Sequence, residues 1–514
     1  MQAKPRAVSF EPVPDAVLAD ILRIVQKAPT GFNTQPYAVV LVRKQADRDR
    51  LADAMLATNG RKVKDAPVVA VFAADLEPSL RVPRLQKMMY DNGDAAAAIN
   101  NLPHYLRMFS GEGHLAGGIR SLISTAVSPL QAVPSMVPTI AWSFKQTTFA
   151  ASAFLYAAQS YGLATCPMEG FDELRVRNAL DIPDRYAIPV VVACGYPSPE
   201  NAQSSTKPSP RLAPEELFFD GKFGHSTVSH LEMWLLSAAA TAALVHAASG
   251  SSVSNSPPSS LDQTCASPDI PTMSTFDVVS TLLNERGSLR EYADTPVPDE
   301  VIAELLRLAQ RAPTAFNTQP YVAILVRSEE DKTRLAPAML DSNRIKITGA
   351  AFSVAFVADL EPSKNIPRLQ ELLREGGAPD GFINAMPGYL AGFSGENTPE
   401  GAKSWSYKQT SIAAATFIYA AAAKGLATCP MEGFDQEAIK KALGLSDRYS
   451  VAIVVSVGYP KDGAKPHVSG RRPPTEVFFE GQLGGSTAAL FETNALYVST
   501  CMQNATSAST TVII

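Results

Sequence analysis

The feature that most constrains the fold of this chain is that long blocks of its sequence occur twice and in the same order. The loop at Ala28–Tyr37, APTGFNTQPY, returns at Ala312–Tyr321 as APTAFNTQPY, and the block at Gly162–Asp172, GLATCPMEGFD, returns unchanged at Gly425–Asp435. A shared order of several blocks indicates duplication of a whole domain rather than convergence of one loop. Because 514 residues are also too many for one ordinary core, we expect two related domains.

The segments without a repeat set the expected domain boundaries. A Ser/Pro-rich stretch at 249–272 predicts a flexible linker between a first domain at 1–248 and a second domain at 273–500, and a Ser/Thr-rich tail follows at 501–514. The first half also carries an insert at 111–141 that the second half lacks, and we expect this insert to border a pocket.

Composition narrows the class of protein. Hydrophobic residues make up 46% of the chain and charged residues 18%, which is typical of a soluble globular protein. The net charge of −5 provides no general basic field, so neither nucleic acid nor an anionic membrane surface is expected as a partner. The apolar run at Met233–Ala248 is shorter than the roughly 20 residues of a membrane span, so we expect no span.

Cysteine usage and the N-terminus bear on the compartment. The five cysteines are odd in number and form no CxxC pair or Cys/His cluster, which argues against a disulfide framework and against a metal site. We therefore predict a reducing compartment, with the cytoplasm preferred and an organelle as the alternative. The N-terminal stretch MQAKPRAVSF has no apolar signal core and no long Arg/Ser-rich segment, so no targeting segment is expected.

Residue patterns in the first half predict an α+β fold. Apolar residues recur at helical spacing over Val13–Ala28, and Phe144–Gly162 reads as a long buried helix that ends at a glycine. β-Branched runs predict strands at Tyr37–Arg43, Ala66–Asp75 and Ile188–Pro197. No GxGxxG or GxxxxGK[ST] motif follows a strand, so neither type of nucleotide site is supported.

Several polar groupings are candidates for binding, each with a plainer alternative. The amides and hydroxyls of Thr30, Asn33 and their repeats could hold an anion or a ring edge, or could satisfy local turns. The Pro-Met-Glu-Gly sequence that includes Glu169 places a carboxylate and a glycine N–H at the edge of a core, or forms an ordinary turn.

Basic residues of the second half form two further candidate groups. The alternation Arg286, Ser288, Arg290 suits a phosphate, or forms a solvated basic face. Asn343 and Lys346 lie on one face if their segment is helical, either as a site or as a surface pair.

Taken together, these blocks resemble the nitroreductase family of FMN-dependent oxidoreductases. The second half shows six blocks of the family pattern in order: Arg286/Ser288/Arg290, Ala312–Tyr321, Asn343/Lys346, Trp405–Gln409, Pro430–Asp435 and Arg471/Arg472. The resemblance implies two nitroreductase-like domains, each a mostly antiparallel or mixed sheet flanked by helices. It also implies that the two halves pair as an intramolecular pseudo-dimer with FMN sites at their interface, which would explain why the polar loop occurs twice.

The resemblance also implies roles for residues of the second half. Arg286, Ser288, Arg290 and Arg471 would hold the FMN phosphate, Asn343 and Lys346 would face the pyrimidine end of the ring, and Glu432 and Gly433 would lie near N5. The full set of expected cofactor contacts for this site adds Gln409, Pro430 and, from the loop of the first half, Pro29, Thr30 and Asn33.

The first half repeats most of this set and departs in one block. Its expected cofactor contacts are Arg6, Asn59, Lys62, Gln146, Pro167, Glu169, Gly170 and Arg211, with Pro313, Thr314 and Asn317 lent by the second half. Gln2 and Lys4 stand where Arg286 and Ser288 stand in the second half. Loss of one charge-assisted phosphate contact costs about 1.5–3 kcal/mol, so we expect the site built on the second half to bind FMN more tightly.

The implied reaction moves two electrons from NAD(P)H through the flavin to a small acceptor such as a quinone or a nitroaromatic compound. The chemistry belongs to the cofactor, so no side chain is predicted to be catalytic. The alternatives are reductive dehalogenation or a flavin-consuming reaction on the same fold, and a degenerate flavin-binding scaffold.

Overall fold

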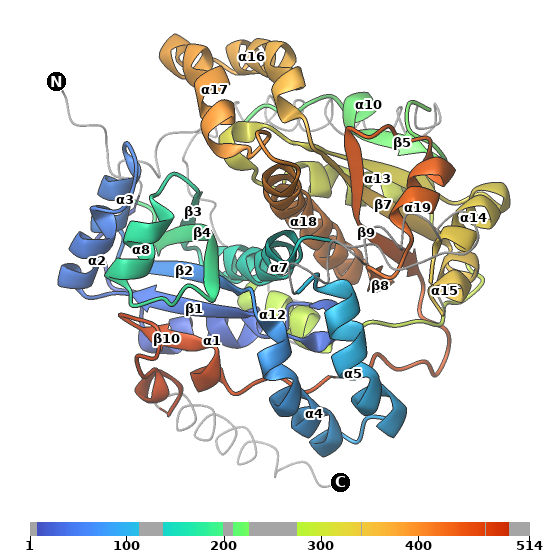
Figure 1. Ribbon diagram of the computed structural model, residues 1–514, viewed down its shortest axis with the longest axis horizontal. Helices are drawn as coiled ribbons and strands as arrows, with labels where there is room; N and C mark the ends of the chain where they lie inside the picture. The colour runs from blue at the N-terminus through green and yellow to red at the C-terminus, as the bar shows by residue number, and fades with distance from the viewer. Residues whose placement is uncertain are drawn as a thin grey trace, which may run out of the picture.

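The computed structural model describes residues 8–112, 137–198, 209–225, 275–340, 342–467 and 469–492, and it shows two sheets on either side of two long central helices (Figure 1). The apolar run at Met233–Ala248, most of the insert, the predicted linker and the tail lie outside the described residues. In the part of the chain that is described, no helix is long and apolar enough to cross a membrane.

The elements of the first half are α1 (Asp15–Val25), η1 (Gly31–Asn33), β1 (Tyr37–Val42), α2 (Gln45–Ala52), α3 (Asn59–Asp65), β2 (Val68–Asp75), η2 (Pro78–Arg81), α4 (Val82–Asp91), α5 (Ala96–Phe109), α7 (Thr139–Ser160), β3 (Ala164–Met168), α8 (Glu173–Ala179), β4 (Tyr186–Gly195), α10 (Pro214–Leu217) and β5 (Phe218–Asp220).

The elements of the second half are α12 (Thr275–Glu285), α13 (Asp299–Gln310), η3 (Ala315–Asn317), β6 (Tyr321–Val326), α14 (Glu329–Leu335), η4 (Ala336–Ala338), α15 (Asn343–Gly349), β7 (Phe352–Asp359), η5 (Pro362–Asn365), α16 (Ile366–Glu375), α17 (Asp380–Phe393), α18 (Pro399–Ala423), β8 (Ala427–Met431), α19 (Gln436–Leu443), β9 (Tyr449–Gly458), η6 (Pro474–Glu476) and β10 (Phe478–Glu480).

Both sheets have five strands. They are mixed, as the family resemblance implies. Their strand orders are β10-β1-β2-β4-β3 and β5-β6-β7-β9-β8, and in each sheet the first pair is parallel while the others are antiparallel. Strands β1 and β2 are buried along their whole length. They therefore read as continuous apolar runs instead of alternating ones.

The two halves exchange their last strands. β10 of the second half pairs with β1 of the first, with Val39 opposite Phe478, and β5 of the first half pairs with β6 of the second, with Phe218 opposite Ala323. Figure 1 shows red β10 beside blue β1 and green β5 beside the sheet of the second half. Neither five-stranded sheet is therefore complete without a strand from the other half.

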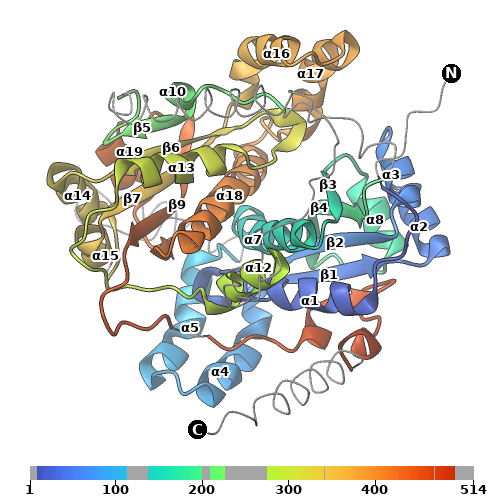
Figure 2. The same cartoon turned by 180° about the vertical axis from the view of Figure 1, so that it is seen from behind.

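Helices α7 and α18 pack against each other in the middle of the molecule, as Figure 2 shows from behind. Tyr156 of α7 is hydrogen-bonded to Thr416 of α18 at 2.5 Å, and Tyr419 of α18 donates to the carbonyl of Phe149 at 3.3 Å. One hydrophobic core surrounds these helices and draws residues from both halves, whereas a smaller core lies on the outer face of each sheet. The shared core ties the halves into one body.

Two local expectations change in detail. Helix α7 begins at Thr139 rather than near Phe144, because Pro138 stands at its N-cap and the residues after it are buried against the opposite half. Pro167 and Met168 belong to β3, so the expected polar turn shortens to Glu169 and Gly170. A proline fits in β3 because this strand lies at the edge of its sheet.

Candidate functional site

The two repeated polar loops share an uncommon backbone. Positive φ angles occur at corresponding non-glycine residues of both loops: Phe32 (52°), Asn33 (54°), Gln35 (45°), Phe316 (51°), Asn317 (59°) and Gln319 (46°). Such conformations cost of order 1–3 kcal/mol each and persist where the surroundings enforce them, often at functional sites. The turn hydrogen bonds expected as the plain alternative are present, because Thr30 Oγ1 accepts from the N–H of Gln35 at 3.0 Å.

The same loops also reach the opposite half. The guanidinium of Arg471 donates to Asn33 Oδ1 at 2.5 Å, and Asn33 Nδ2 donates at 2.6 Å to the carbonyl just before that arginine. Arg211 and Asn317 repeat this contact at 2.9 Å and, for the return bond, 2.8 Å. Each late arginine of one half is thus positioned by the loop of the other.

Further basic residues of the second half gather near Arg471. Arg286 directly follows α12, is half-buried, and lies close enough to Arg471 for their like charges to interact. Its Nε and Nη1 atoms have no hydrogen-bond acceptor among the described residues. Ser288 forms a backbone bridge to Thr428 of β8, whose hydroxyl is also buried without a partner, and Arg290 follows on the same segment.

A buried guanidinium without an acceptor is costly, and burial lowers the pKa of Arg286 accordingly. An anion with several acceptor oxygens would satisfy it, and a phosphate matches the fork of N–H donors that arginine presents. The arrangement around Arg286 and Arg471 therefore fits the phosphate group of a cofactor.

Asn343 and Lys346 lie one turn apart on α15, as the spacing predicts. Lys346 Nζ donates to Asn343 Oδ1 at 2.6 Å, and Asn343 Nδ2 donates to the carbonyl of Gly433 at 3.0 Å. A Cβ added to Gly433 would lie 2.7 Å from that amide, so a side chain has no room there. Burial, reinforced by nearby Arg290 and opposed by Cys429, lowers the pKa of Lys346.

The carboxylate of Glu432 is held by helix α7 of the opposite half. Lys145 Nζ lies 3.0 Å from Glu432 Oε2, and Gln146 Nε2 donates to Glu432 Oε1 at 2.6 Å. The other end of the Gln146 amide accepts from the N–H of Gly31 at 2.7 Å. Gln146 therefore joins the polar loop of the first half to the glutamate loop of the second.

Helix α18 makes the mirror-image contacts. Lys408 lies 2.7 Å from Glu169 Oε2, while Gln409 donates to Glu169 Oε1 at 2.6 Å and accepts from the N–H of Ala315 at 2.9 Å. The repeat pattern assigns Gln146 to the site of the first half and Gln409 to the site of the second half. In the structure, each glutamine instead contacts the glutamate of the opposite half.

The expected contacts thus fall into two groups, each drawn from both halves. We call them the second-half group and the first-half group, after the half that supplies the glutamate. The second-half group contains Arg286, Ser288, Arg290, Asn343, Lys346, Pro430, Glu432, Gly433 and Arg471 with Pro29, Thr30, Asn33 and Gln146. The first-half group contains Asn59, Lys62, Pro167, Glu169, Gly170 and Arg211 with Pro313, Thr314, Asn317 and Gln409.

The first-half group repeats the α15 arrangement on α3. Lys62 Nζ donates to Asn59 Oδ1 at 3.0 Å, and Asn59 Nδ2 donates to the carbonyl of Gly170 at 3.1 Å. Arg6, expected at the phosphate end of this group, lies outside the described residues, so its position stays a prediction.

The two lysines Lys145 and Lys408 were not among the predicted site residues. Both are buried in a helix that is otherwise mostly apolar, and both precede a glutamine at corresponding places in the repeat. A buried lysine needs a partner, so its repetition in an apolar helix was the available signal. Within the described residues, no group of His, Cys, Asp and Glu could hold a metal ion.

Comparison with known proteins assigns the family. The sequence pattern of the nitroreductase family matches residues 5–196 and 283–459, which together are more than half of the chain. This protein belongs to the nitroreductase family, and it contains the family's domain twice.

Individual relatives match one half at a time. A protein named NADH dehydrogenase from Thermus thermophilus is 32% identical over 202 residues, which are 39% of this chain and 86% of that protein. A solved FMN-dependent nitroreductase from Clostridium difficile is 20% identical, with 36% of this chain and 90% of that chain covered and a TM-score of 0.26. A nitroreductase family protein from Streptococcus pneumoniae is 20% identical, with 38% and 96% covered and a TM-score of 0.34.

Proposed function

We propose that this chain is an FMN-dependent oxidoreductase that passes two electrons from NAD(P)H to a small acceptor such as a quinone or a nitroaromatic compound. Membership of the nitroreductase family and the name of the Thermus thermophilus relative support this class of reaction. The flavin would supply the redox chemistry, while the protein would bind the flavin, orient it and exclude water from it.

The observation that carries the proposal is the buried guanidinium of Arg286, which has two nitrogen atoms without an acceptor and lies near Arg471. Arg286 and Arg471, together with Ser288 and Arg290, would bind the phosphate of FMN. An anion would neutralise this cluster of positive charge and would give the two buried nitrogen atoms of Arg286 an acceptor.

The remaining residues of the second-half group would orient the ring. Asn343 and Lys346 would face its pyrimidine end, where a lysine stabilises negative charge on the reduced ring. The backbone of Glu432 and Gly433 would lie near N5, and the side chain of Glu432 cannot swing away because Lys145 and Gln146 hold it.

The two groups would bind FMN with different affinities. In the second half Arg286 is present, whereas Gln2 stands at the corresponding place in the first half. The loss of one charge-assisted contact, about 1.5–3 kcal/mol, would weaken the first-half group by about 10- to 100-fold.

Reconstitution with FMN tests the proposal. Protein freed of flavin is titrated with FMN, the flavin bands are recorded, and NADH or NADPH is then added without oxygen. We expect two bound flavins per chain with unequal affinities, bleaching by the reduced nicotinamide, and recovery of the bands when a quinone is added.

Other outcomes separate the alternatives. A chain that stays colourless at high FMN concentration would contradict the proposal and favour a scaffold. Two sites of equal affinity would reject the asymmetry alone. Bound flavin that neither nicotinamide bleaches would reject NAD(P)H as the donor.

A further inference from the structure

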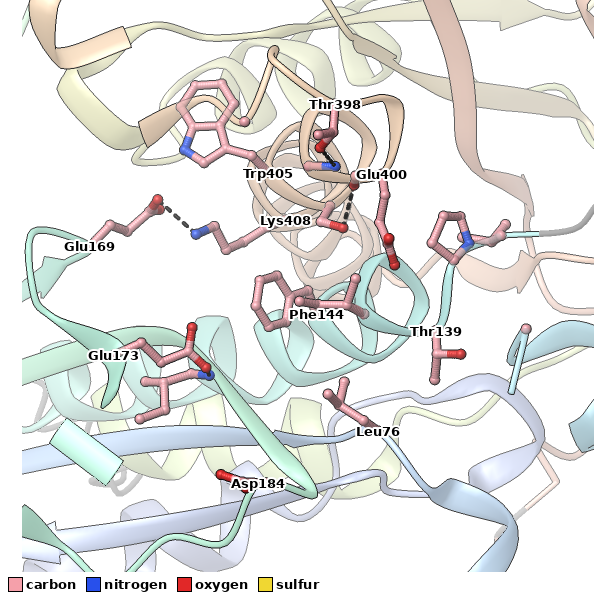
Figure 3. A pocket seen from close by; sticks show the side chains of 18 of the residues that line it. Leu76, Thr139, Phe144, Glu169, Glu173, Asp184, Thr398, Glu400, Trp405 and Lys408 are labelled. Atoms are coloured by element: carbon pink, nitrogen blue, oxygen red, sulfur yellow. Dashed lines mark hydrogen bonds and ion pairs between the residues drawn. The ribbon is translucent and has the colours of Figure 1, made fainter. Parts of the chain in front are cut away.

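A large pocket lies at the interface of the halves near the starts of α7 and α18 (Figure 3). Most residues of the first-half and second-half groups do not line it. Its volume is about 1270 Å³, more than enough for a drug-sized ligand. Among its described lining residues it shares Glu169 and Lys408 with the contacts of the first-half group, but Asn59, Lys62 and Thr314 do not line it. Both ends of the insert border it, as the sequence predicts.

The lining of this pocket is apolar at its floor and acidic around it. Phe144 and Leu76 belong to one small hydrophobic cluster, and Ile188 lines the floor beside them. The described carboxylates that line the pocket are Glu77, Glu112, Glu169, Glu173, Asp184 and Glu400, against the two cations Arg185 and Lys408.

Both cations are already neutralised. Lys408 is paired with Glu169 at 2.7 Å, and Arg185 donates to the buried carboxylate of Asp75 at 2.7 and 2.6 Å. Among the described lining residues, an anionic ligand would therefore find no available positive charge, and these residues together favour a cation.

Glu173 is the carboxylate that best defines a binding point. Its Oε1 accepts from the N–H of Ile188 at 3.1 Å, and no described cation forms an ion pair with it. Figure 3 shows its carboxylate directed toward Phe144. Burial raises the pKa of Glu173, although the N–H of Ile188 and the charges of Arg177 and Lys408 act in the opposite direction.

The corresponding corner of the second half is built differently. Tyr407, Ser450 and Gln436 occupy the places of Phe144, Ala187 and Glu173 in the repeat. There the hydroxyl of Tyr407 bonds Ser450 Oγ at 2.8 Å, and Gln436 Nε2 donates to the same oxygen at 2.9 Å.

The first half therefore carries three coordinated differences. A neutral hydrogen-bonded network is replaced by two apolar side chains and one carboxylate that forms no ion pair with a described cation. A half-buried carboxylate beside apolar side chains favours a ligand that places positive charge next to it and apolar surface along the floor.

We propose that this pocket binds an organic cation, with its positive charge against Glu173 and its apolar body along Phe144, Ile188 and Leu76. The second half lacks this site because Tyr407, Ser450 and Gln436 carry no charge there. The proposal does not depend on flavin binding, so it can fail or hold independently of the proposed reaction.

Calorimetric titration of the full chain, with and without FMN, tests the site with benzyltrimethylammonium as the probe and benzenesulfonate as its anionic counterpart. We expect saturable binding of about one cation per chain and no binding of the anion. The Glu173→Gln substitution keeps the acceptor for the N–H of Ile188 and should weaken cation binding at least about tenfold. Glu215→Gln, at an exposed position that does not line the pocket, is the matched control and should change affinity less than about twofold.

A second variant guards against misfolding of the first. This triple variant, Phe144→Tyr, Ala187→Ser and Glu173→Gln, reproduces the neutral network of the second half. It should also abolish cation binding. Absence of saturable cation binding, equal binding of benzenesulfonate, or unchanged affinity in either variant would overturn the proposal.

Discussion

At the scale of single residues, one glutamine in each half joins two loops. Gln146 and Gln409 each bond a backbone N–H of their own half's polar loop and a glutamate of the opposite half. The neutral amide is essential because it donates at one end and accepts at the other. A carboxylate of the same shape could not donate to Glu169 or Glu432.

Exchange of either glutamine for glutamate should therefore disable one group at a time. Gln409→Glu places two carboxylates about 2.6 Å apart beside Glu169, and we expect FMN affinity of the first-half group to fall by about 10- to 100-fold while the second-half group keeps its flavin. Gln146→Glu should do the reverse. Flavin titration measures both, with exposed Gln159→Glu as the control. Equal loss at both groups in each variant would contradict this assignment.

A second prediction at this scale concerns Asp75, which is fully buried. Burial would raise the pKa of this carboxyl, but hydrogen bonds and charges from Arg185 and Arg81 outweigh burial and lower it. Because the pKa of Asp75 is lower in the folded state, its carboxylate stabilises the fold at pH values above the unfolded-state pKa near 3.9. This stabilisation is lost as the pH falls through the folded-state pKa. We expect Asp75→Asn to lower the free energy of unfolding at pH 7 by about 3–5 kcal/mol.

The pH dependence of that difference is the check. In urea denaturation, the gap between the original chain and Asp75→Asn should shrink as the pH is lowered below about 4. A gap that stays constant from pH 7 to pH 3 would show that packing, rather than charge, is what the aspartate contributes.

At the scale of elements, the exchanged strands decide how the halves combine. β5 and β10 have three residues each, and each fills the edge of the opposite sheet with a buried phenylalanine, Phe218 or Phe478. The sequence repeats FFDG and FFEG, which marks these segments as equivalent. Three residues are too few to show a strand period, however, and local sequence cannot reveal which sheet they join.

Features that depend on local sequence could be predicted in other parts of the fold, whereas contacts between the halves could not. Buried strands such as β1 and β2 follow from their β-branched runs, and Asn343 and Lys346 share one face of α15, as expected for a helical segment. The hydrogen bond from Gln146 to Glu432 depends on how α7 packs against the opposite half, and no local sequence pattern specifies that packing.

Removal of one exchanged phenylalanine tests this interface. Phe478→Ala should lower the free energy of unfolding by about 3–5 kcal/mol, because it removes a fully buried ring from the shared core. Phe10→Ala, at an exposed position, is the control and should change stability by less than about 0.5 kcal/mol. A loss below about 1 kcal/mol for Phe478→Ala would mean that β10 contributes little to the sheet.

At the scale of the whole molecule, the two halves share one core and complete each other's sheets. These shared contacts should hold the halves together without a covalent connection between them. We expect a chain cut at a protease site engineered into 249–272 to stay together during size-exclusion chromatography and to keep its flavin. Separation of the two fragments without denaturant would contradict the interlocked architecture.

The central claim is that each flavin lies between the two halves and is held by both. A crystal structure of the chain bound to FMN tests it most directly. The account predicts that the phosphate contacts Arg286 and Arg471, and that the ring lies between Thr30 and Asn33 of the first half and Glu432 and Lys346 of the second. A flavin whose contacts come from one half alone would contradict it.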